Sequence, residues 1–194
     1  MTIKRTPLHE QCIQNGGRFS PFAGWEMPIQ FSGLKEEHKA VRNHAGVFDI
    51  SHMGIFKLEG TNTKDALQKL VPSDLSRIGP NEACYTLLLN NEGKILDDLI
   101  IYDLGVNKKN KEEIIIVINA ACTESDICWI TKHLADSNII IKDIKKEGVF
   151  LAIQGPNAEK LLQKYFESQL NKLQKFNHKY FSLKFHESDL EKVF

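Results

Sequence analysis

The apolar residues of this chain follow two spacings, which together predict an irregular series of strands and helices. Short apolar runs between turn-forming residues predict strands at 53–58, 83–89, 95–104, 113–120, 138–144 and 148–154. Apolar residues that recur on one helical face predict helices at 34–45, 63–71 and 123–137. Hairpin-like turns join the elements in place of regular βαβ units. The pattern therefore favours an α+β fold with antiparallel sheets and flanking helices.

Capping residues predict where the helices begin and end. Ser32 is placed to cap the first helix and Gly46 to end it. Thr123 is placed to cap the helix that follows it, and Pro156 suits the first position of another helix. The segment 5–31 is rich in glycine, proline and aromatic residues. It is expected to hold loops and short strands and no helix.

Two adjacent aspartates, Asp97 and Asp98, interrupt the apolar strand predicted at 95–104. Aspartate is a poor strand former, and burial of its charge without a partner is costly. One interpretation is structural, in which either residue caps a bulge or pairs with a nearby lysine. The other is an active-site carboxylate, because an aspartate among tyrosine and isoleucine has a tunable proton affinity and can steer an amine or a cation. The spacing is compatible with both.

A predicted hairpin indicates which side chains share a face with these aspartates. The turn-forming residues NNEG (90–93) join two apolar strands. A turn centred on the middle of NNEG places Tyr85 directly opposite Asp98. Alternation along the strand then separates two faces, one with Asp98, Ile100 and Tyr102, the other with Asp97, Leu99, Ile101 and Asp103.

A third strand brings an amide toward the same region. Ile115, Val117 and Asn119 alternate onto a single face. The lysine-rich loop 105–111 is too long to fix the register of this strand. Asn119 therefore shares a face with Asp98 or, after a slip of one residue, with Asp97.

Composition narrows the class of protein. The chain has 194 residues, enough for one large or two small domains, and 42% hydrophobic with 26% charged residues is typical of a globular protein. Basic and acidic residues number 25 each, so neither nucleic acid nor a membrane surface is an expected partner. The N-terminal residues lack a signal-peptide core, and the location is expected to be cytoplasmic. Four scattered cysteines are expected to be reduced thiols, and no metal is expected.

Six stretches, in order along almost the whole chain, resemble the aminomethyltransferase family, the T-protein of the glycine cleavage system. They are RTPLHE (5–10), FAGWEMP (22–28), VRNHAGVFDISHMG (41–54), ACYTLLLNNEGKILDDLIIY (83–102), VINAAC (117–122) and AIQGPNA (152–158). The clusters FAGWEMP, GVFDISHMG and DDLI are the most specific.

The resemblance implies an enzyme with tetrahydrofolate as co-substrate and no metal. Members of the family take an aminomethyl group from the reduced lipoyl arm of the H-protein, which is the implied protein partner. The methylene passes to tetrahydrofolate, ammonia leaves, and 5,10-methylenetetrahydrofolate forms.

The resemblance also implies site residues. The critical aspartate of the family matches Asp98, the second carboxylate of DDLI. A fixed carboxylate there would stabilise the iminium-like charge of the transferred carbon, orient the folate amine or relay its proton. Tyr85 and Tyr102 match aromatic positions around the pterin, Asn119 a position that can hydrogen-bond its edge, and Met53 an apolar contact.

The resemblance implies two interleaved modules, and only part of the family fold. Residues 1–52 and 142–194 are expected to form a first, discontinuous and incomplete module. Residues 53–141 form an inserted module that carries Asp98. Chains of the family are nearly twice as long, and continue into a segment of the type RTGYTGE. The chain is expected to be a fragment; the alternative is a short protein completed by a partner.

Two other functions remain open at this stage. One is a non-enzymatic folate-binding protein related to iron–sulfur cluster assembly factors. The other is the folate domain of a sarcosine or dimethylglycine dehydrogenase, against which the start at RTPLHE counts. The DDLI and SHMG clusters favour the enzyme.

Overall fold

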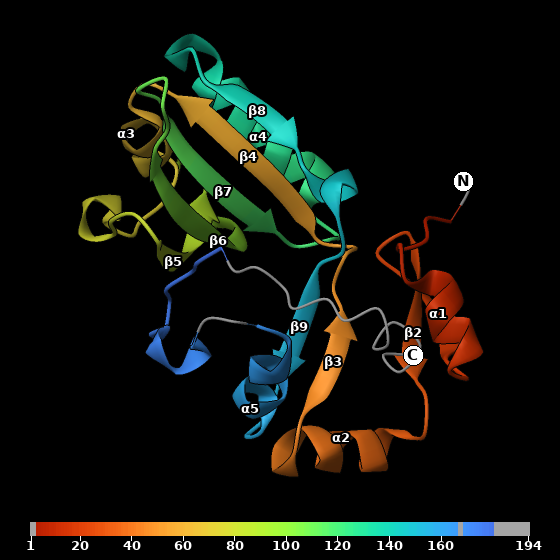
Figure 1. Cartoon of the computed structure of the whole chain (residues 1–194). Helices are drawn as coiled ribbons and strands as arrows, with labels where there is room; N and C mark the ends of the chain where they lie inside the picture. The colour runs from red at the N-terminus through yellow and green to blue at the C-terminus, as the bar shows by residue number, and fades with distance from the viewer. Residues whose placement is uncertain (1–2, 167–168, 181–194) are drawn as a thin grey trace. The chain divides into compact units, whose positions relative to one another are not determined.

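The computed structural model describes residues 3–166 and 169–180. These residues form two compact units (Figure 1). The first unit holds 3–52 and most of the described residues after 148, and the second unit holds 53–148 together with the short segment 175–178.

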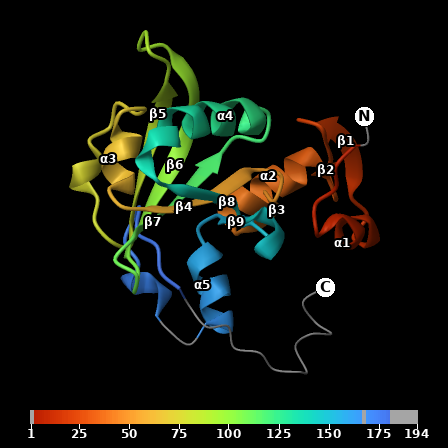
Figure 2. The ribbon, with the colours of Figure 1, turned by 90° about the horizontal axis from the view of Figure 1, so that it is seen from above.

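The second unit is built on a five-stranded antiparallel sheet (Figure 1). Its strand order is β5-β6-β7-β4-β8. The strands are β4 (Gly54–Gly60), β5 (Glu82–Leu89), β6 (Ile95–Val106), β7 (Glu112–Ile118) and β8 (Ile140–Asp143). The helices of this unit, also seen from above in Figure 2, are α3 (Thr63–Gln68) and α4 (Thr123–Leu134), with short 3-10 turns at Leu75–Arg77, Ala135–Ser137 and Lys145–Glu147.

The hydrophobic core of this unit lies between one face of the sheet and the helices α3 and α4. Along β4, buried residues alternate with partly exposed ones without interruption, as the pleat of a strand with one covered face requires. The buried face is lined by Leu58, Ile101, Ile114, Ile116 and Ile118, packed with Leu67 of α3 and Ile130 and Leu134 of α4. The opposite face, which carries Asp98 and Tyr102, is only half-buried.

The first unit contains two small antiparallel sheets. One pairs β1 (Arg18–Phe22) with β2 (Trp25–Gln30), and the other pairs β3 (Gly46–Asp49) with β9 (Leu151–Gln154). Its helices are α1 (His9–Gln14), α2 (Leu34–Asn43) and α5 (Ala158–Leu162), with 3-10 turns at Gln163–Tyr165 and Leu170–Lys172. The α+β class and the antiparallel sheets predicted from the sequence are confirmed.

The expectation of no helix in 5–31 is wrong, because this segment contains α1. The six residues of α1, HEQCIQ, include no glycine or proline. Pro7 and the Gly16–Gly17 pair lie outside the helix on either side. The prediction considered the glycine and proline content of the whole segment, and it therefore missed a short run that contains neither residue.

The predicted caps of α2 are also wrong. The N-cap residue is Gly33 and not Ser32, and as a glycine it has no side chain that could cap the helix. The carboxylate of Glu37 reaches back and accepts the backbone N–H groups of Phe31 at 2.7 Å and Gly33 at 2.9 Å. These bonds lower the pKa of Glu37, with the Gly33 bond as the largest cause. The helix ends at Asn43, and Gly46 instead begins β3, where an added Cβ would lie 2.6 Å from the Val41 side chain.

Two other helix starts lie beside the predicted positions. Thr123 is the first residue of α4 and Cys122 its N-cap; the Thr123 hydroxyl donates to the Asn119 carbonyl at 2.9 Å. Pro156 precedes α5, which begins at Ala158. Thr123 therefore lies one position inside its helix, whereas Pro156 lies in the turn before its helix.

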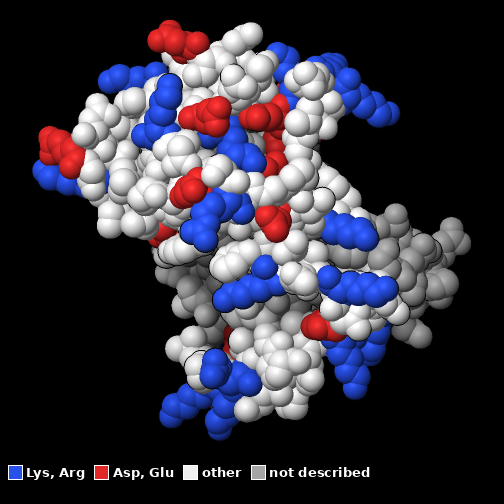
Figure 3. Space-filling view, turned by 90° about the vertical axis from the view of Figure 1, so that its left-hand side faces the viewer, with Lys and Arg blue, Asp and Glu red and all other residues white. Residues whose placement is uncertain are grey.

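Basic and acidic side chains are interspersed over the face drawn in Figure 3. Within 3–166 and 169–180, no helix has the length and apolar character that a membrane span requires.

Candidate functional site

The hairpin of β5 and β6 has a different register from the one predicted. Tyr85 pairs with Ile100, and Asp98 pairs with Leu87. The expectation that Tyr85 lies directly opposite Asp98 is therefore wrong by two positions. Pairing is irregular near the turn, where Leu88 pairs with Asp97 but Leu89 with Ile95, which leaves an extra residue in β6.

The turn itself explains the first step of this shift. The Asn90 amide N–H donates to the Lys94 carbonyl at 2.9 Å, so three residues, not two, form the loop. The Asn90 side-chain oxygen accepts the N–H groups of Glu92 and Lys94, both at 2.9 Å. Gly93 has a φ of 76°, which glycine adopts without strain. The bulge that follows supplies the second step.

The predicted placement of Tyr85 on the face of Asp98 is nevertheless correct, because the observed register differs from the predicted one by an even number of residues. A slip of two residues keeps each side chain on its side of the sheet. Asp98, Ile100 and Tyr102 lie on the half-buried face, and Tyr85 shares that face as the diagonal neighbour of Asp98. The Tyr85 hydroxyl donates to the Asp98 carboxylate; this hydrogen bond and then the Asp98 charge raise the pKa of Tyr85.

The position of Asn119, left open by the sequence, is decided by the pairing of β6 with β7. Leu99 pairs with Ile118, and Asn119 follows Ile118 directly, which places Asn119 beside Asp98. The Asn119 amide nitrogen donates to the Asp97 carboxylate at 3.0 Å, to the Asp98 carbonyl at 3.2 Å and to the Asp98 carboxylate at 3.3 Å. One amide thus contacts both aspartates of the DDLI sequence.

Met53 and Tyr102 lie at different distances from this group. Met53 directly precedes Gly54, which pairs with Ile118, so Met53 lies at the same end of the sheet as Asn119. Tyr102 is four residues from Asp98 along β6, which corresponds to about 13 Å. Burial raises the pKa of Tyr102, and its ring meets the His178 ring edge-on with centroids 5.5 Å apart. Tyr102 therefore extends the half-buried face and does not contact Asp98.

A buried carboxyl group, not identified from the sequence, lies behind this site. Asp126 on α4 is only 3% exposed. Single ligand-type atoms of Asp97, Cys122 and Asp126 lie within 4.8 Å of one another. A sequence signal did exist, since Asp126 stands four residues before Ile130 and eight before Leu134, on the face of α4 that enters the core.

Burial raises the pKa of Asp126 to about 7, helped by a hydrogen bond to Asp97 and by the charge of Asp97. The folded state therefore binds the proton of Asp126 more tightly than the unfolded chain does. Its contribution to stability is fully present below the unfolded pKa of about 4 and is lost as the pH rises through 7. Burial also raises the pKa of Cys122, followed by the charge of Asp97, so this residue is a neutral thiol and a poor nucleophile.

The Tyr85 contact gives a direct test of the geometry. In an Asp98→Asn chain we expect the pKa of Tyr85 to fall toward its ordinary value, because the acceptor charge is gone. Ultraviolet titration of the phenols, with a Tyr85→Phe chain to assign the signal, measures this change. Tyr102 is the internal control, since burial alone raises its pKa. An unchanged Tyr85 titration would show that the two side chains do not meet.

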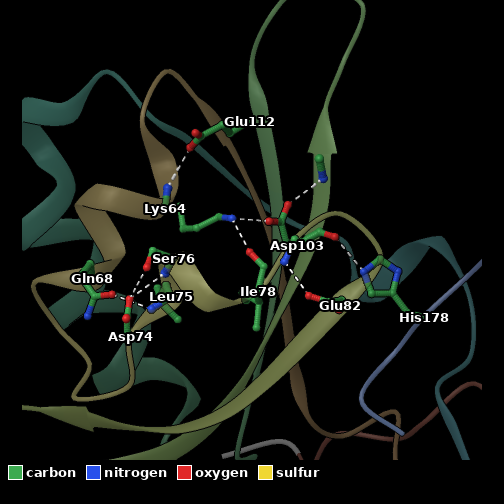
Figure 4. Close-up of polar contacts among 12 residues, drawn as sticks. Lys64, Gln68, Asp74, Leu75, Ser76, Ile78, Glu82, Asp103, Glu112 and His178 are labelled. Carbon is green, nitrogen blue, oxygen red and sulfur yellow. Dashed lines mark hydrogen bonds and ion pairs between the residues drawn. The ribbon is translucent and has the colours of Figure 1, made fainter. Parts of the chain in front are cut away.

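Asp103, on the opposite face of β6, belongs to a separate structural cluster (Figure 4). Asp103 is 4% exposed, and its carboxylate pairs with the Lys64 ammonium at 2.5 Å and accepts the Gly105 N–H at 2.8 Å. Lys64 also donates to the Ile78 carbonyl at 2.8 Å. The His178 ring reaches the Asp103 backbone carbonyl at 2.9 Å. Each charged group here has its partner, so the cluster joins α3 and the segment 175–178 to the sheet.

Comparison with known proteins supports one family. The sequence model described as GCVT N-terminal domain matches residues 8–192. An aminomethyltransferase of Prochlorococcus marinus strain MIT 9303 is 56% identical over 179 residues, which are 92% of this chain and 48% of the relative. One from Parasynechococcus marenigrum strain WH8102 is 55% identical over 184 residues, covering 95% of this chain and 50% of the relative. The chain thus spans about half the length of these curated relatives.

A solved structure agrees with these matches. The crystal structure of the glycine cleavage system aminomethyltransferase T from Bartonella henselae aligns with a TM-score of 0.76 at 32% identity. The alignment covers 84% of this chain and 43% of that protein.

Proposed function

Because the chain belongs to the GCVT N-terminal domain family, we propose that it carries the reactive carboxylate and part of the folate-binding surface of a glycine cleavage aminomethyltransferase. The reaction moves a methylene from the aminomethyl group on the lipoyl arm of the H-protein to tetrahydrofolate, with release of ammonia. The H-protein is the proposed protein partner, and the cytoplasm the proposed location.

The observation that carries this proposal is the setting of Asp98. Its carboxylate lies on the half-buried face of the sheet and accepts hydrogen bonds from Asn119 at 3.3 Å and from Tyr85. These two donors hold the carboxylate in one orientation. A charge that is fixed and only partly solvated stabilises developing positive charge better than water does, because it needs no reorganisation during the reaction.

The neighbouring side chains fit a flat, polar-edged ligand such as a pterin. Tyr85 is 55% exposed and offers an aromatic surface for stacking. The Asn119 nitrogen is engaged by Asp97 and Asp98, so its oxygen is the atom through which it accepts a ligand N–H. Met53 at the sheet end and Tyr102 along β6 extend the surface with apolar contacts.

The names of the relatives favour the enzyme over the alternative functions. The relatives described above are named aminomethyltransferases, and the solved structure is a glycine cleavage aminomethyltransferase T. We therefore favour the transferase over a folate-binding protein of iron–sulfur cluster assembly and over the folate domain of a dehydrogenase.

A chimera tests the proposal, since the chain matches about half of each relative. The matched part of the Prochlorococcus marinus MIT 9303 enzyme, 48% of its length, is replaced by this chain. We expect the chimera to form methylenetetrahydrofolate from aminomethylated H-protein and tetrahydrofolate, because Asp98 and its neighbours come from this chain. Methylenetetrahydrofolate and ammonia are both measured.

Two controls make the chimera decisive. The parent enzyme gives the reference rate, and the parent's remaining half alone is expected to be inactive because it lacks the carboxylate. Circular dichroism and thermal unfolding establish that the chimera is folded. A folded chimera without activity, beside an active parent, would contradict the proposed function.

A further inference from the structure

Two carboxyl oxygens behind the proposed site have no ordinary hydrogen-bond donor. The Oδ2 atoms of Asp97 and Asp126 are both buried, and neither has a hydrogen-bond partner in the described part of the chain; the Cys122 thiol does interact with the Asp97 carboxyl group. The other oxygens do have donors. Asp97 Oδ1 accepts the Asn119 amide at 3.0 Å, and Asp126 Oδ1 accepts the Ser125 hydroxyl at 3.3 Å.

The two carboxyl groups lie against each other. Asp126 is 3% exposed, one oxygen of its carboxyl lies within 4.8 Å of one oxygen of Asp97, and the two carboxyl groups interact as a hydrogen-bonded pair. A hydrogen bond between two carboxyl groups requires a proton on one of them, since an ionised carboxylate only accepts. Two buried charges of the same sign at this distance would repel strongly, and a shared proton removes one of them.

The titratable groups that face the pair do not supply a compensating positive charge. They are Asp98, next to Asp97 on β6, and the Cys122 thiol at the start of α4. Both are acids. A proton shared by the pair is therefore the simplest way to remove one of its two negative charges within the described surroundings.

We propose that Asp97 and Asp126 hold one proton between their Oδ2 atoms, and that this proton positions Asp97 and Asn119 against the Asp98 carboxylate. The inference rests on the proposed function of Asp98 for its use in the reaction. Asp126 is a positioning residue: it acts through Asp97, and Asp97 acts through the amide that both aspartates of β6 share. One proton among the three carboxyl groups leaves two negative charges, one shared within the buried Asp97–Asp126 pair and one on Asp98, which faces the half-buried surface.

Vibrational and magnetic resonance measurements on the full chain test the proton directly, without folate. Infrared spectra follow the C=O band of a protonated carboxyl group across the pH range around neutrality. We expect the wild-type chain to show one such band that disappears with rising pH, and the band to be absent from Asp126→Asn and Asp97→Asn. Asp136→Asn is the matched control, because Asp136 is exposed on a 3-10 turn, and the band is expected to persist there and in Asp98→Asn.

The positioning role has a separate readout. The side-chain amide resonance of Asn119 is expected to shift with pH at the same midpoint as the infrared band, and to become insensitive to pH in Asp126→Asn. The asparagine variant keeps the shape of the residue and offers its own N–H to Asp97, so folding is expected to be retained. A wild-type chain without the band near neutral pH would overturn the shared proton even if both variants failed to fold.

Three further results would overturn the inference. If the infrared band of the protonated carboxyl group is unaffected in Asp126→Asn, the proton lies on a different carboxyl group. An Asn119 resonance that does not follow the band removes the positioning role. Stoichiometric zinc binding that is lost in Asp126→Asn and Cys122→Ser, with no protonated carboxyl, identifies a cation in place of the proton. Each of these results is independent of the transferase activity, so failure of the proposed function is distinguished from failure of this inference.

Discussion

Asp98→Asn is expected to slow methylenetetrahydrofolate formation by the chimeric enzyme about 100-fold, the size of loss seen when one preorganised electrostatic group is removed from a site. Asparagine keeps the shape of the side chain and loses its charge. The positive charge on the transferred carbon would then lack its fixed counter-charge. The rate is measured with saturating tetrahydrofolate and aminomethylated H-protein.

Two comparisons separate this effect from a general loss of structure. Asp136→Asn makes the same chemical change at an exposed position and is expected to leave the rate unchanged. Circular dichroism of Asp98→Asn is expected to match that of the parent, because Asp98 is only half-buried. An Asp98→Asn enzyme as fast as its parent would remove Asp98 from its proposed role.

Asp103→Asn is expected to lower the free energy of unfolding of the sheet unit by about 3 kcal/mol, because removal of one partner from a buried ion pair leaves the other charge uncompensated. The Lys64 ammonium would keep only the Ile78 carbonyl of its two partners, which are drawn in Figure 4. The chain has two tryptophans, of which Trp129 lies in the sheet unit. Its fluorescence in a Trp25→Phe background reports urea unfolding of this unit alone.

The exposed pair of Glu92 and Lys94 is the matched control. Its atoms approach to 2.6 Å, but the two side chains are 68% and 75% exposed. Glu92→Gln is therefore expected to change the unfolding free energy by well under about 1 kcal/mol, as is usual for surface pairs. Equal effects of Asp103→Asn and Glu92→Gln would show that burial does not set the strength of the Lys64–Asp103 pair.

The double variant Lys64→Met, Asp103→Asn gives a further check. It removes both charges, so no uncompensated charge remains. We expect it to cost less than the sum of the two single variants, and a cost equal to that sum would argue against direct coupling.

The faces of the hairpin could be predicted from the sequence, whereas its register could not. Alternation of apolar and polar residues along 95–104 is a local property, and the structure keeps Asp98, Ile100 and Tyr102 on one face. The register depended on the conformation of Asn90 to Lys94 and on a bulge beside Leu88. Small differences in turn conformation decide such details, and the letters NNEG are compatible with more than one turn.

The sequence by itself determined the family resemblance, the α+β class and the choice of Asp98, near the start of an apolar strand, as the candidate site residue. These follow from spacings within single segments. Only the tertiary structure decided that Asn119 lies beside Asp98 and that Asp126 meets Asp97. Both are contacts between segments distant in the sequence, set by strand pairing and by the packing of α4 on the sheet. Periodicity shows which way a side chain points, but not which residue of another element it will meet.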